Sequence, residues 1–418
     1  MIKRQIFDKI KAHLEQKEIS LIVGPRQAGK TTLMNLLKEE LDRNGEKTLF
    51  LSLDFEKDRR FFVSQEALLQ KIRLEVGNKQ GFIFLDEIQR KEDAGLYLKG
   101  LYDMDLPYKF IVSGSGSLEL KEKIHESLAG RKRIFELSTL SFQEFVNFKT
   151  DYRYEQKLQE FFKVEPERVR SLFDEYLHFG GYPRVVLAQT LEEKQQIISE
   201  IYQAYLEKDI FYLLGAQKEE AFTHLVRVLA SQIGSLVNIS ELSNTLGIST
   251  KTVKQYLWYL EKTFIVNKVT PYYRNVRKEL TKSPVYYFVD FGLRNYASGE
   301  FARLTDSSLS LGFLFQNFVF HALREKLLLP SFHLHFWRTK DGAEVDFVTD
   351  NAMEAIPLEV KYKDFKKPEL DRSFRSFLSK YTPQKAYIVN LTLDEELIID
   401  KTKVAFVPFH KLLFISFD

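Results

Sequence analysis

Short apolar runs separated by amphipathic, helix-like stretches occupy the first 140 or so residues of the chain. The runs are Ile19–Val23, residues 48–55 (TLFLSLDF), Phe82–Leu85 and residues 109–120 (KFIVSGSGSLEL), and RKRIFEL follows them. Their apolar positions are continuous rather than alternating, which is typical of strands covered on both faces. Strands that alternate with helices predict an α/β fold with a parallel, doubly wound sheet.

Beyond this region the pattern changes twice. Residues 152–220 are helical in pattern, apart from a Gly-Gly-Tyr-Pro turn, and short helices and strands are mixed after that. We therefore expect four domains: an α/β domain over residues 1–150, a helical bundle over 151–225, a helix-turn-helix module over 226–282, and a second α/β domain over 283–418.

Composition narrows the class of protein. The 418 residues are 44% apolar and 28% charged, which is ordinary for globular domains, and they include no cysteine, which excludes disulfides and thiolate zinc sites. The chain shows neither the apolar run of a signal peptide nor one long enough to span a membrane, so we expect a cytoplasmic protein with no membrane partner. A net charge of +3 permits nucleic-acid binding without indicating it.

The first candidate site follows the first apolar run, in ISLIVGPRQAGKTTLMNLLKEEL. Its glycines, lysine and threonine form the pattern G-x-x-x-x-G-K-T between a strand and an amphipathic helix, which is the context that a phosphate-binding P-loop requires. Backbone N–H groups of such a loop face a phosphate at the helix N-terminus. The sequence therefore predicts ATP and Mg²⁺ as cofactors. The predicted nucleotide-binding residues are Gly24, Pro25, Arg26, Gln27, Ala28, Gly29, Lys30, Thr31 and Thr32.

Two acids complete the predicted site. Lys30 would reach the β- and γ-phosphates, and the hydroxyl of Thr31 would bind Mg²⁺. Asp86 ends the strand of GFIFLDEIQR and would bind Mg²⁺ through water, while Glu87 would polarise the attacking water as a catalytic residue. An adjacent glutamate indicates ATP hydrolysis rather than phosphate binding alone. The alternative is that both acids only serve a turn.

Three further polar residues are candidates with open alternatives. Ser113 and Ser115 end a strand, where Ser113 could sense the γ-phosphate as a catalytic residue or simply belong to a turn. Arg131 in SLAGRKR is a candidate arginine finger that would contact the phosphate of a neighbouring subunit, or else part of a basic turn. Arg184 in HFGGYPRVVL could approach phosphate or form a structural salt bridge.

A helix-turn-helix pattern begins at ISELSNTLGIST. Residues 241–246 predict a short helix before Gly247, and Ser249 would cap a second helix with Val253 and Leu257 on its apolar face. A strand, FIVNKV, follows, so the layout is that of a winged helix. Basic residues outnumber acidic ones between positions 251 and 282: Lys251, Lys254, Lys262, Lys268, Arg274, Arg277, Lys278 and Lys282 against Glu261 and Glu279. This favours contact with the DNA backbone, with protein packing as the alternative.

The second candidate site lies in WRTKDGAEVDFVTDNAMEAIPLEVKY. Residues two apart share a face of a strand, so Glu344 lies with Asp346 and Glu359 lies with Lys361. If the two strands form a hairpin, these charged faces converge on a site for Mg²⁺, in the pattern of restriction-endonuclease-like nucleases. The alternative is a solvated hairpin face. A metal role for His333 and His335 in FHLHFW competes in the same way with a surface strand.

Several phrases together resemble one family. VGPRQAGKTTL, FLDEIQR, VSGSGS, SLAGRKRIFELSTLSFQEF, FGGYPRVVL, YLEKDI, YYFVDFGLRNY and WRTKDGAEVDFV are similar to a prokaryotic AAA-type ATPase family with a C-terminal domain of unknown function. The resemblance implies ATP binding and hydrolysis, and a restriction-endonuclease-like core near the C-terminus. It also implies Glu-Asn on the helix before the hairpin, where this chain has Gln316-Asn317, and that replacement removes one negative charge from the expected metal site.

The sequence thus predicts a P-loop ATPase domain followed by a helical bundle, a winged helix and a restriction-endonuclease-like α/β domain. The expected function is ATP hydrolysis coupled to a DNA-binding, nuclease-like module. One alternative is a nucleotide-dependent switch or scaffold whose C-terminal domain binds nucleic acid or a protein without cleaving it, and another is a protein remodeller. A homo-oligomer would explain Arg131, since AAA-type proteins often form rings.

Overall fold

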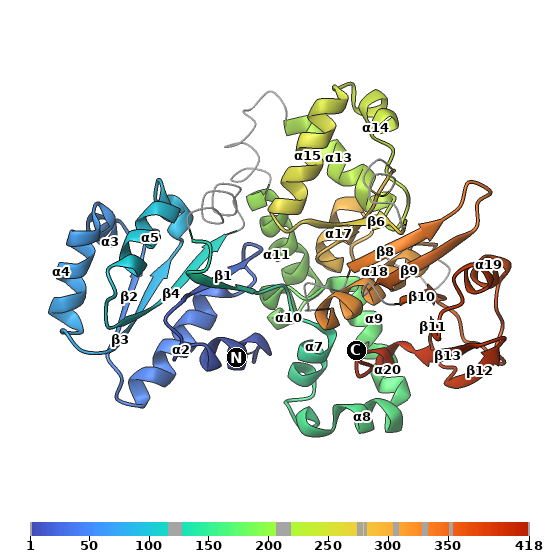
Figure 1. The fold of residues 1–418 in the computed structure, drawn as a ribbon, viewed down its shortest axis with the longest axis horizontal. Helices are drawn as coiled ribbons and strands as arrows, with labels where there is room; N and C mark the ends of the chain where they lie inside the picture. Colours follow the sequence, from blue (N-terminus) through green and yellow to red (C-terminus); the bar gives the residue numbers. More distant parts are fainter. Residues whose placement is uncertain are drawn as a thin grey trace. The chain divides into compact units, whose positions relative to one another are not determined.

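The computed structural model describes residues 2–115, 128–205, 219–273, 279, 282–303, 309–327, 333–350 and 354–416 (Figure 1). These residues form two compact units. The first contains Met1–Phe148, Gly181–Ala216 and Leu257–Ile265, and the second contains Lys149–Gly180, Gln217–Tyr256 and Val266–Asp418.

A five-stranded sheet is the centre of the first unit, and its order is β2-β3-β4-β1-β5. All four strand pairs are parallel. The strands are β1 (Ile19–Gly24), β2 (Thr48–Ser52), β3 (Gly81–Asp86), β4 (Tyr108–Ser115) and β5 (Lys132–Glu136). Each predicted apolar run contains a strand. The order places β1 between β4 and β5, where the last residue of β4, Ser115, pairs with Gly24, and the last residue of β5, Glu136, pairs with Val23. The α/β class of this unit is confirmed.

Helices cover both faces of this sheet, which explains the continuous apolar runs. Leu21 and Ile83 face a core shared with Leu68 of α4 (Gln65–Glu75) and Leu98 of α5 (Ala94–Asp103). Ile22, on the opposite face, packs with Met34 and other residues of α2. The helical elements are α1 (Ile6–Ala12), α2 (Lys30–Arg43), α3 (Glu56–Arg59), η1 (Arg60–Phe62), α4 (Gln65–Glu75), η2 (Ile88–Arg90), α5 (Ala94–Asp103), α7 (Phe142–Lys149), α10 (Pro183–Leu187) and α11 (Leu191–Ala204).

The second unit is built on an eight-stranded mixed sheet of order β12-β13-β11-β10-β9-β8-β6-β7. Its strands are β6 (Val266–Pro271), β7 (Val285–Phe288), β8 (His333–Arg338), β9 (Glu344–Asp350), β10 (Ala355–Val360), β11 (Lys385–Asn390), β12 (Glu395–Ile399) and β13 (Thr402–Pro408). β8, β9 and β10 form an antiparallel meander, whereas β10, β11 and β13 are parallel. β9 and β10 therefore pair in the antiparallel way on which the second candidate site depends.

Helices of the second unit include the crossover that a parallel β10–β11 pair requires. They are η3 (Glu155–Lys157), α8 (Leu158–Val164), α9 (Pro166–Phe179), α13 (Glu219–Ser231), α14 (Ile239–Leu246), α17 (Phe291–Ser298), α18 (Leu309–Lys326), α19 (Arg372–Tyr381) and α20 (Phe409–Leu412). α15 (Thr250–Lys262) has residues in both units. α19 connects β10 to β11, and its Phe374 and Phe377 are buried with Ile388 of β11.

The predicted helix-turn-helix elements are present. Gly247 ends α14 in the left-handed conformation, at φ +64°, and the hydroxyl of Ser249 accepts the backbone N–H of Thr252 at 3.1 Å. However, β6 and β7 are an antiparallel pair, and β6 also pairs with β8. The predicted boundary between residues 282 and 283 therefore crosses a paired hairpin, because the strands flanking it belong to one sheet.

Candidate functional site

The loop after β1 depends on two glycines for different reasons. At Gly24, a Cβ atom would stand 2.0 Å from the backbone oxygen of Leu137, because β1 and the residue after β5 are in close contact there. Gly29 has φ +98° immediately before α2, in the left-handed region that side chains disfavour. The loop between them leads directly into the N-terminus of a 14-residue helix, where free backbone N–H groups and the helix dipole favour an anion.

Lys30 and Thr31 begin that helix and face different partners. The ammonium group of Lys30 donates to the backbone oxygens of Gly24 at 3.1 Å and Pro25 at 2.9 Å, so the lysine lies folded against its own loop and is buried. The hydroxyl of Thr31 donates to the carboxylate of Asp86, at 3.1 Å to Oδ2 and 3.3 Å to Oδ1. A hydroxyl and a carboxylate thus meet at the sheet edge, and both are hard oxygen ligands of the kind that Mg²⁺ prefers.

Asp86 is almost fully buried and is fixed by hydroxyl groups from neighbouring strands. Ser52 of β2 donates to Oδ2 at 3.4 Å, and Ser113 of β4 donates to Oδ1. Ser113 lies inside β4 and is itself fully buried, and its hydroxyl also accepts the backbone N–H of Glu87 at 3.2 Å. Its observed contacts are therefore with the two acids. The side chain of Ser115 lies outside the described residues.

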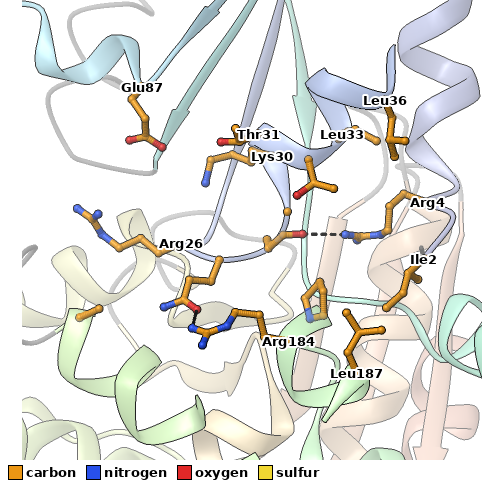
Figure 2. A pocket seen from close by; sticks show the side chains of 16 residues that line it. Ile2, Arg4, Arg26, Lys30, Thr31, Leu33, Leu36, Glu87, Arg184 and Leu187 are labelled. Carbon is orange, nitrogen blue, oxygen red and sulfur yellow. Dashed lines mark hydrogen bonds between the residues drawn. The ribbon is translucent and has the colours of Figure 1, made fainter. Parts of the chain in front are cut away.

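Glu87 follows the end of β3 in a left-handed backbone conformation, at φ +57°. Such a conformation is uncommon for a residue with a side chain and costs about 1 kcal/mol or more. It turns Glu87 out of the strand direction, and the side chain lines the cavity beside Lys30 and Thr31 (Figure 2). The side-chain amide of Gln89 donates to Oε2 of Glu87.

A cavity of about 490 Å³ adjoins these residues. This volume lies within the range of roughly 300–1,000 Å³ that is typical of small-molecule sites. Beyond the loop residues, it is lined by Ile2, Arg4, Leu33, Leu36, Glu87, Pro183, Arg184, Leu187 and Ala204. The lining therefore combines charged side chains with apolar ones.

Arg184, from α10, lies across the cavity from Thr31 (Figure 2). Its guanidinium donates to Oε1 of Gln27 at 2.9 Å and to Oε2 of Glu200 at 3.1 Å. Gln27 belongs to the loop, and its φ of +58° turns the loop backbone at that point. Arg184 therefore forms the salt bridge that was one of its sequence alternatives, and it also borders the cavity.

Arg131 lies away from this cavity. It precedes β5, and its backbone oxygen accepts the N–H of Ile19 at the start of β1, so it occupies the opposite edge of the parallel sheet from the loop after β1. Its guanidinium pairs with Asp103, at 2.7 Å from Nε to Oδ1. Within one chain, the structure does not bring Arg131 together with Lys30 and Glu87.

A second polar cluster occupies the sheet of the second unit. The side-chain amide of Gln316, on α18, donates to Oδ1 of Asp346 at 2.7 Å. The backbone N–H of Val360 donates to Oδ2 of the same carboxyl group at 2.7 Å. Burial raises the pKa of Asp346 to about 7. Both carboxyl oxygens of Asp346 thus already accept a hydrogen bond from within the protein.

Glu359 and Lys361 lie beside Asp346 as their spacing predicts. Lys361 donates to Oε1 of Glu359 at 2.7 Å and pairs with Oδ2 of Asp371 at 3.1 Å. Oε2 of Glu359 is buried and has no hydrogen-bond partner in the part of the chain that the structure describes. Burial raises the pKa of Glu359, and the negative charge of the nearby Asp346 raises it further. Burial alone would lower the pKa of Lys361, but the adjacent Glu359 outweighs this effect, and the pKa of Lys361 is raised.

The sequence did not single out Asp371, which caps α19 by accepting the N–H of Phe374. An aspartate directly before a helical run is a common N-cap, so the capping role of Asp371 could have been predicted from the sequence. Its ion pair with Lys361 could not, because no short sequence pattern connects the two positions.

The other residues proposed for this region lie elsewhere. Glu344 is exposed at the start of β9 and pairs with Arg338 at 3.4 Å. No hydrogen bond among the described contacts joins it to the cluster. His333 is exposed, and His335 is buried against the hydroxyl of Thr270. Among the described residues, no group of three or more histidine, aspartate or glutamate side chains is placed to hold a metal ion.

Several lysines of the helix-turn-helix region are exposed, whereas Lys262 is half-buried. Lys251 and Lys254 on α15, Lys268 on β6 and Lys282 before β7 are all exposed. Arg274, Arg277 and Lys278 lie outside the described residues. Of the opposing acids, Glu279 already accepts the hydroxyl of Thr270 at 3.1 Å. None of the described helices is long and apolar enough to cross a membrane.

Comparison with protein families divides the chain into three segments. Residues 16–146 match the model of an AAA domain, residues 170–304 match a domain of unknown function (DUF8612), and residues 311–412 match another domain of unknown function (DUF4143). The first match covers the sheet, the loop after β1, and both Asp86 and Glu87. Residues 16–146 of the first unit are therefore similar in sequence to AAA domains.

Sequence similarity to other proteins covers nearly the whole chain. An uncharacterised protein of Mycobacterium tuberculosis is 28% identical over 378 residues, which cover 90% of this chain and 77% of that protein. An uncharacterised protein of Haemophilus influenzae is 26% identical over 405 residues, with 93% of each chain covered. Among solved structures, the Orc1 protein of Aeropyrum pernix in complex with DNA has 13% identity and a TM-score of 0.33, and covers 72% of this chain and 94% of its own.

Proposed function

We propose that this AAA-domain protein binds ATP with Mg²⁺ and hydrolyses it at the cavity beside β1. The observation that carries the proposal is the meeting of Lys30, Thr31 and Asp86 at the carboxyl edge of a parallel sheet, with Glu87 turned into the same cavity. Open parallel sheets bind ligands at this edge, and each of these residue types has a distinct task in phosphoryl transfer.

Each group has a role that follows from its present contacts. The backbone N–H groups of residues 24–32 would surround the phosphates, and Lys30 would exchange its two carbonyl partners for the β- and γ-phosphates. Thr31 and Asp86 would hold Mg²⁺, since their oxygens already lie within 3.1 Å of each other. The ion would supply charge neutralisation at the phosphates. Glu87 would accept a proton from the attacking water.

The remaining candidates act at the margins of this site. Ser113 fixes Asp86 and the backbone of Glu87, so its proposed task is to position the two acids. Arg184 would add positive charge opposite the loop from within the same chain. Arg131 would reach a phosphate only in another subunit. A homo-oligomer is therefore required for that role, and a mass that remains monomeric in ATP would exclude it.

Steady-state hydrolysis of MgATP tests the enzymatic proposal. Wild-type protein should release phosphate, and Glu87→Gln should lower kcat by about 10²-fold or more, because a water-polarising base is lost while the volume is kept. Lys17→Ala is a matched control, since Lys17 pairs with Asp105 on the surface of the same unit. Turnover that persists unchanged in Glu87→Gln would defeat the assignment of Glu87.

We further propose that the second unit binds DNA. Exposed Lys251 and Lys254 lie on the second helix of a helix-turn-helix pair, and Lys268 lies on the following strand. Lysines placed in this way neutralise backbone phosphates without reading a base sequence. The order α18, β8–β9–β10, α19, β11 supports a restriction-endonuclease-like core, with an antiparallel meander followed by a helical crossover to a parallel strand.

The polar cluster in this core does not suit a catalytic cation. Three of the four carboxyl oxygens of Asp346 and Glu359 accept N–H donors from the protein, and Gln316 contributes an amide donor where an anionic ligand is expected. Among the described residues, only Oε2 of Glu359 lacks such a donor. Gly234 packs closely against the side chain of Gln316, because a Cβ atom at this position would stand 2.5 Å from Oε1 of Gln316. These contacts favour a nucleotide-dependent switch that binds DNA without cleaving it.

Incubation with linear and branched DNA separates the two functions. In Mg²⁺ or Mn²⁺, the wild-type protein should retard both DNAs in a gel and leave them intact, with binding that weakens steeply as salt rises. Asp346→Ala should bind DNA equally well. Cleavage by the wild type that is lost in Asp346→Ala would instead establish a nuclease.

A further inference from the structure

We infer that Arg4 is a positioning residue for nucleotide binding, which holds the P-loop in its phosphate-binding shape from the N-terminal segment of the chain. The inference rests on the proposed ATP site and adds to it a residue that lies before the AAA match at residues 16–146. Arg4 lines the same cavity, and its guanidinium points at the loop (Figure 2).

The guanidinium of Arg4 joins segments that are distant in sequence. Nη1 donates to the backbone oxygen of Ala28, in the loop, at 3.0 Å. Nη2 donates to the backbone oxygens of Ser138 at 2.7 Å and Thr139 at 3.2 Å, in the segment that follows β5. Arg4 therefore fixes the direction of one loop carbonyl relative to the end of the sheet.

A buried carboxylate supports this geometry. Nε of Arg4 pairs with Oε2 of Glu144 at 3.1 Å, and the exposed fractions of the two side chains are 9% and 7%. Glu144 also accepts the backbone N–H groups of Gln5 and Ser141. The charge of Arg4 is thus compensated where it is withdrawn from water, and its planar group is held in one orientation.

These contacts are part of a closed ring around the cavity. The segment held by Arg4 continues to Leu140, whose backbone N–H donates to the oxygen of Gly181 at 2.8 Å. Gly181 immediately precedes the turn into α10, and from α10 the side chain of Arg184 returns to Gln27 of the loop at 2.9 Å. The loop is therefore held from both sides, by Arg4 at Ala28 and by Arg184 at Gln27.

Holding a loop carbonyl outward has a direct consequence for phosphate binding. A peptide unit is rigid, so fixing the oxygen of Ala28 also fixes the N–H of Gly29, which belongs to the same peptide plane. That N–H begins the turn into α2 and is one of the groups that a P-loop presents to phosphate. Without Arg4, the peptide is free to rotate, and binding must supply the ordering.

Two substitutions break the ring at different points. Arg4→Lys keeps the positive charge for Glu144 but cannot donate to three carbonyl oxygens on two segments at once. Gly181→Ala places a Cβ atom 2.4 Å from the oxygen of Leu140, which displaces the segment that Arg4 holds. Lys17→Ala serves again as a surface control in the same unit.

The experiment measures Kd for MgATP, together with KM, kcat and the melting temperature of the nucleotide-free protein. Arg4→Lys should weaken MgATP binding about tenfold, the effect of losing a charge-assisted hydrogen bond. KM should rise with it, while kcat stays within about twofold, because Glu87 and Asp86 do not move. Gly181→Ala should show the same split, and Lys17→Ala should match the wild type.

A merely structural role would lower the melting temperature and leave Kd at the wild-type value, and that result for either ring variant would overturn the inference. If Arg4→Lys does not fold, Gly181→Ala alone decides the question by the same criterion. A wild-type protein that binds no MgATP would contradict the proposed function itself. A wild type that binds MgATP, together with a variant that binds it equally well, would contradict only the inference about Arg4.

Discussion

At the scale of single residues, short sequence motifs predict some side-chain contacts of this protein and miss others. The pattern G-x-x-x-x-G-K-T and the acid pair at positions 86 and 87 predicted which side chains meet at the sheet edge, and the contact of Thr31 with Asp86 agrees with it. Arg4 escaped prediction because its partners lie 24, 134 and 140 residues away. No spacing rule connects such positions, and in the sequence Arg4 is one of several basic residues at the N-terminus.

A buried histidine gives a residue-scale prediction about pH. His13 is 7% exposed, and burial, with the nearby charges of Lys109 and Arg133, lowers its pKa to about 4. In the unfolded chain the pKa is about 6.5. As the pH falls below 6.5, His13 becomes protonated in the unfolded chain, whereas in the folded chain it stays neutral until about pH 4. The free energy of unfolding should therefore fall between pH 6.5 and pH 4, by about 3 kcal/mol at most.

Thermal unfolding at pH 7.5 and pH 5.0 checks this prediction in wild type and in His13→Asn. The amide oxygen of Asn can accept from Lys109 as Nδ1 of His13 does, but it does not titrate. The variant should be less stable at pH 7.5, because it loses ring contact with Phe135, and should lose less stability on acidification. An identical loss in both proteins would show that His13 does not contribute to the acid sensitivity.

At the scale of elements, strands buried on both faces were the most predictable feature. β1 and β3 are buried at every position, so their sequences are apolar apart from Ser20 and Asp86, and this distinguishes them from their surroundings. β9 and β10 were predicted as a pair because alternation and a short connection are local signals. The pairing of β6 with both β7 and β8 was not predicted, since nothing between residues 271 and 333 indicates which strand returns to which.

The polar cluster shows the same limit for a candidate site. Strand periodicity placed Asp346 near Glu359 and Lys361 correctly, and the resemblance to a family drew attention to Gln316. The sequence could not predict that the N–H of Val360 and the side-chain amide of Gln316 both donate to Asp346, or that Lys361 also pairs with Asp371. Those contacts depend on side-chain orientation, and they change the interpretation from a cation site to a hydrogen-bonded cluster.

For the whole molecule, sequence and structure agree on a P-loop α/β unit and differ on how the rest is divided. The expected winged helix and C-terminal domain share one eight-stranded sheet, whereas the segment Gly181–Ala216, expected in a separate bundle, belongs to the first unit. This segment supplies Arg184 and Leu187 to the cavity proposed to bind ATP. The proposed ATP site is therefore assembled from residues that the predicted boundaries had separated.

Calorimetric titration of the protein with MgATP tests the central claim most directly. Wild-type protein should bind one equivalent of MgATP, and Lys30→Ala should reduce the affinity by about 10²-fold, because a charged partner of the β- and γ-phosphates is removed. A wild type that shows no binding, or a Lys30→Ala variant that binds as tightly as the wild type, would contradict the account.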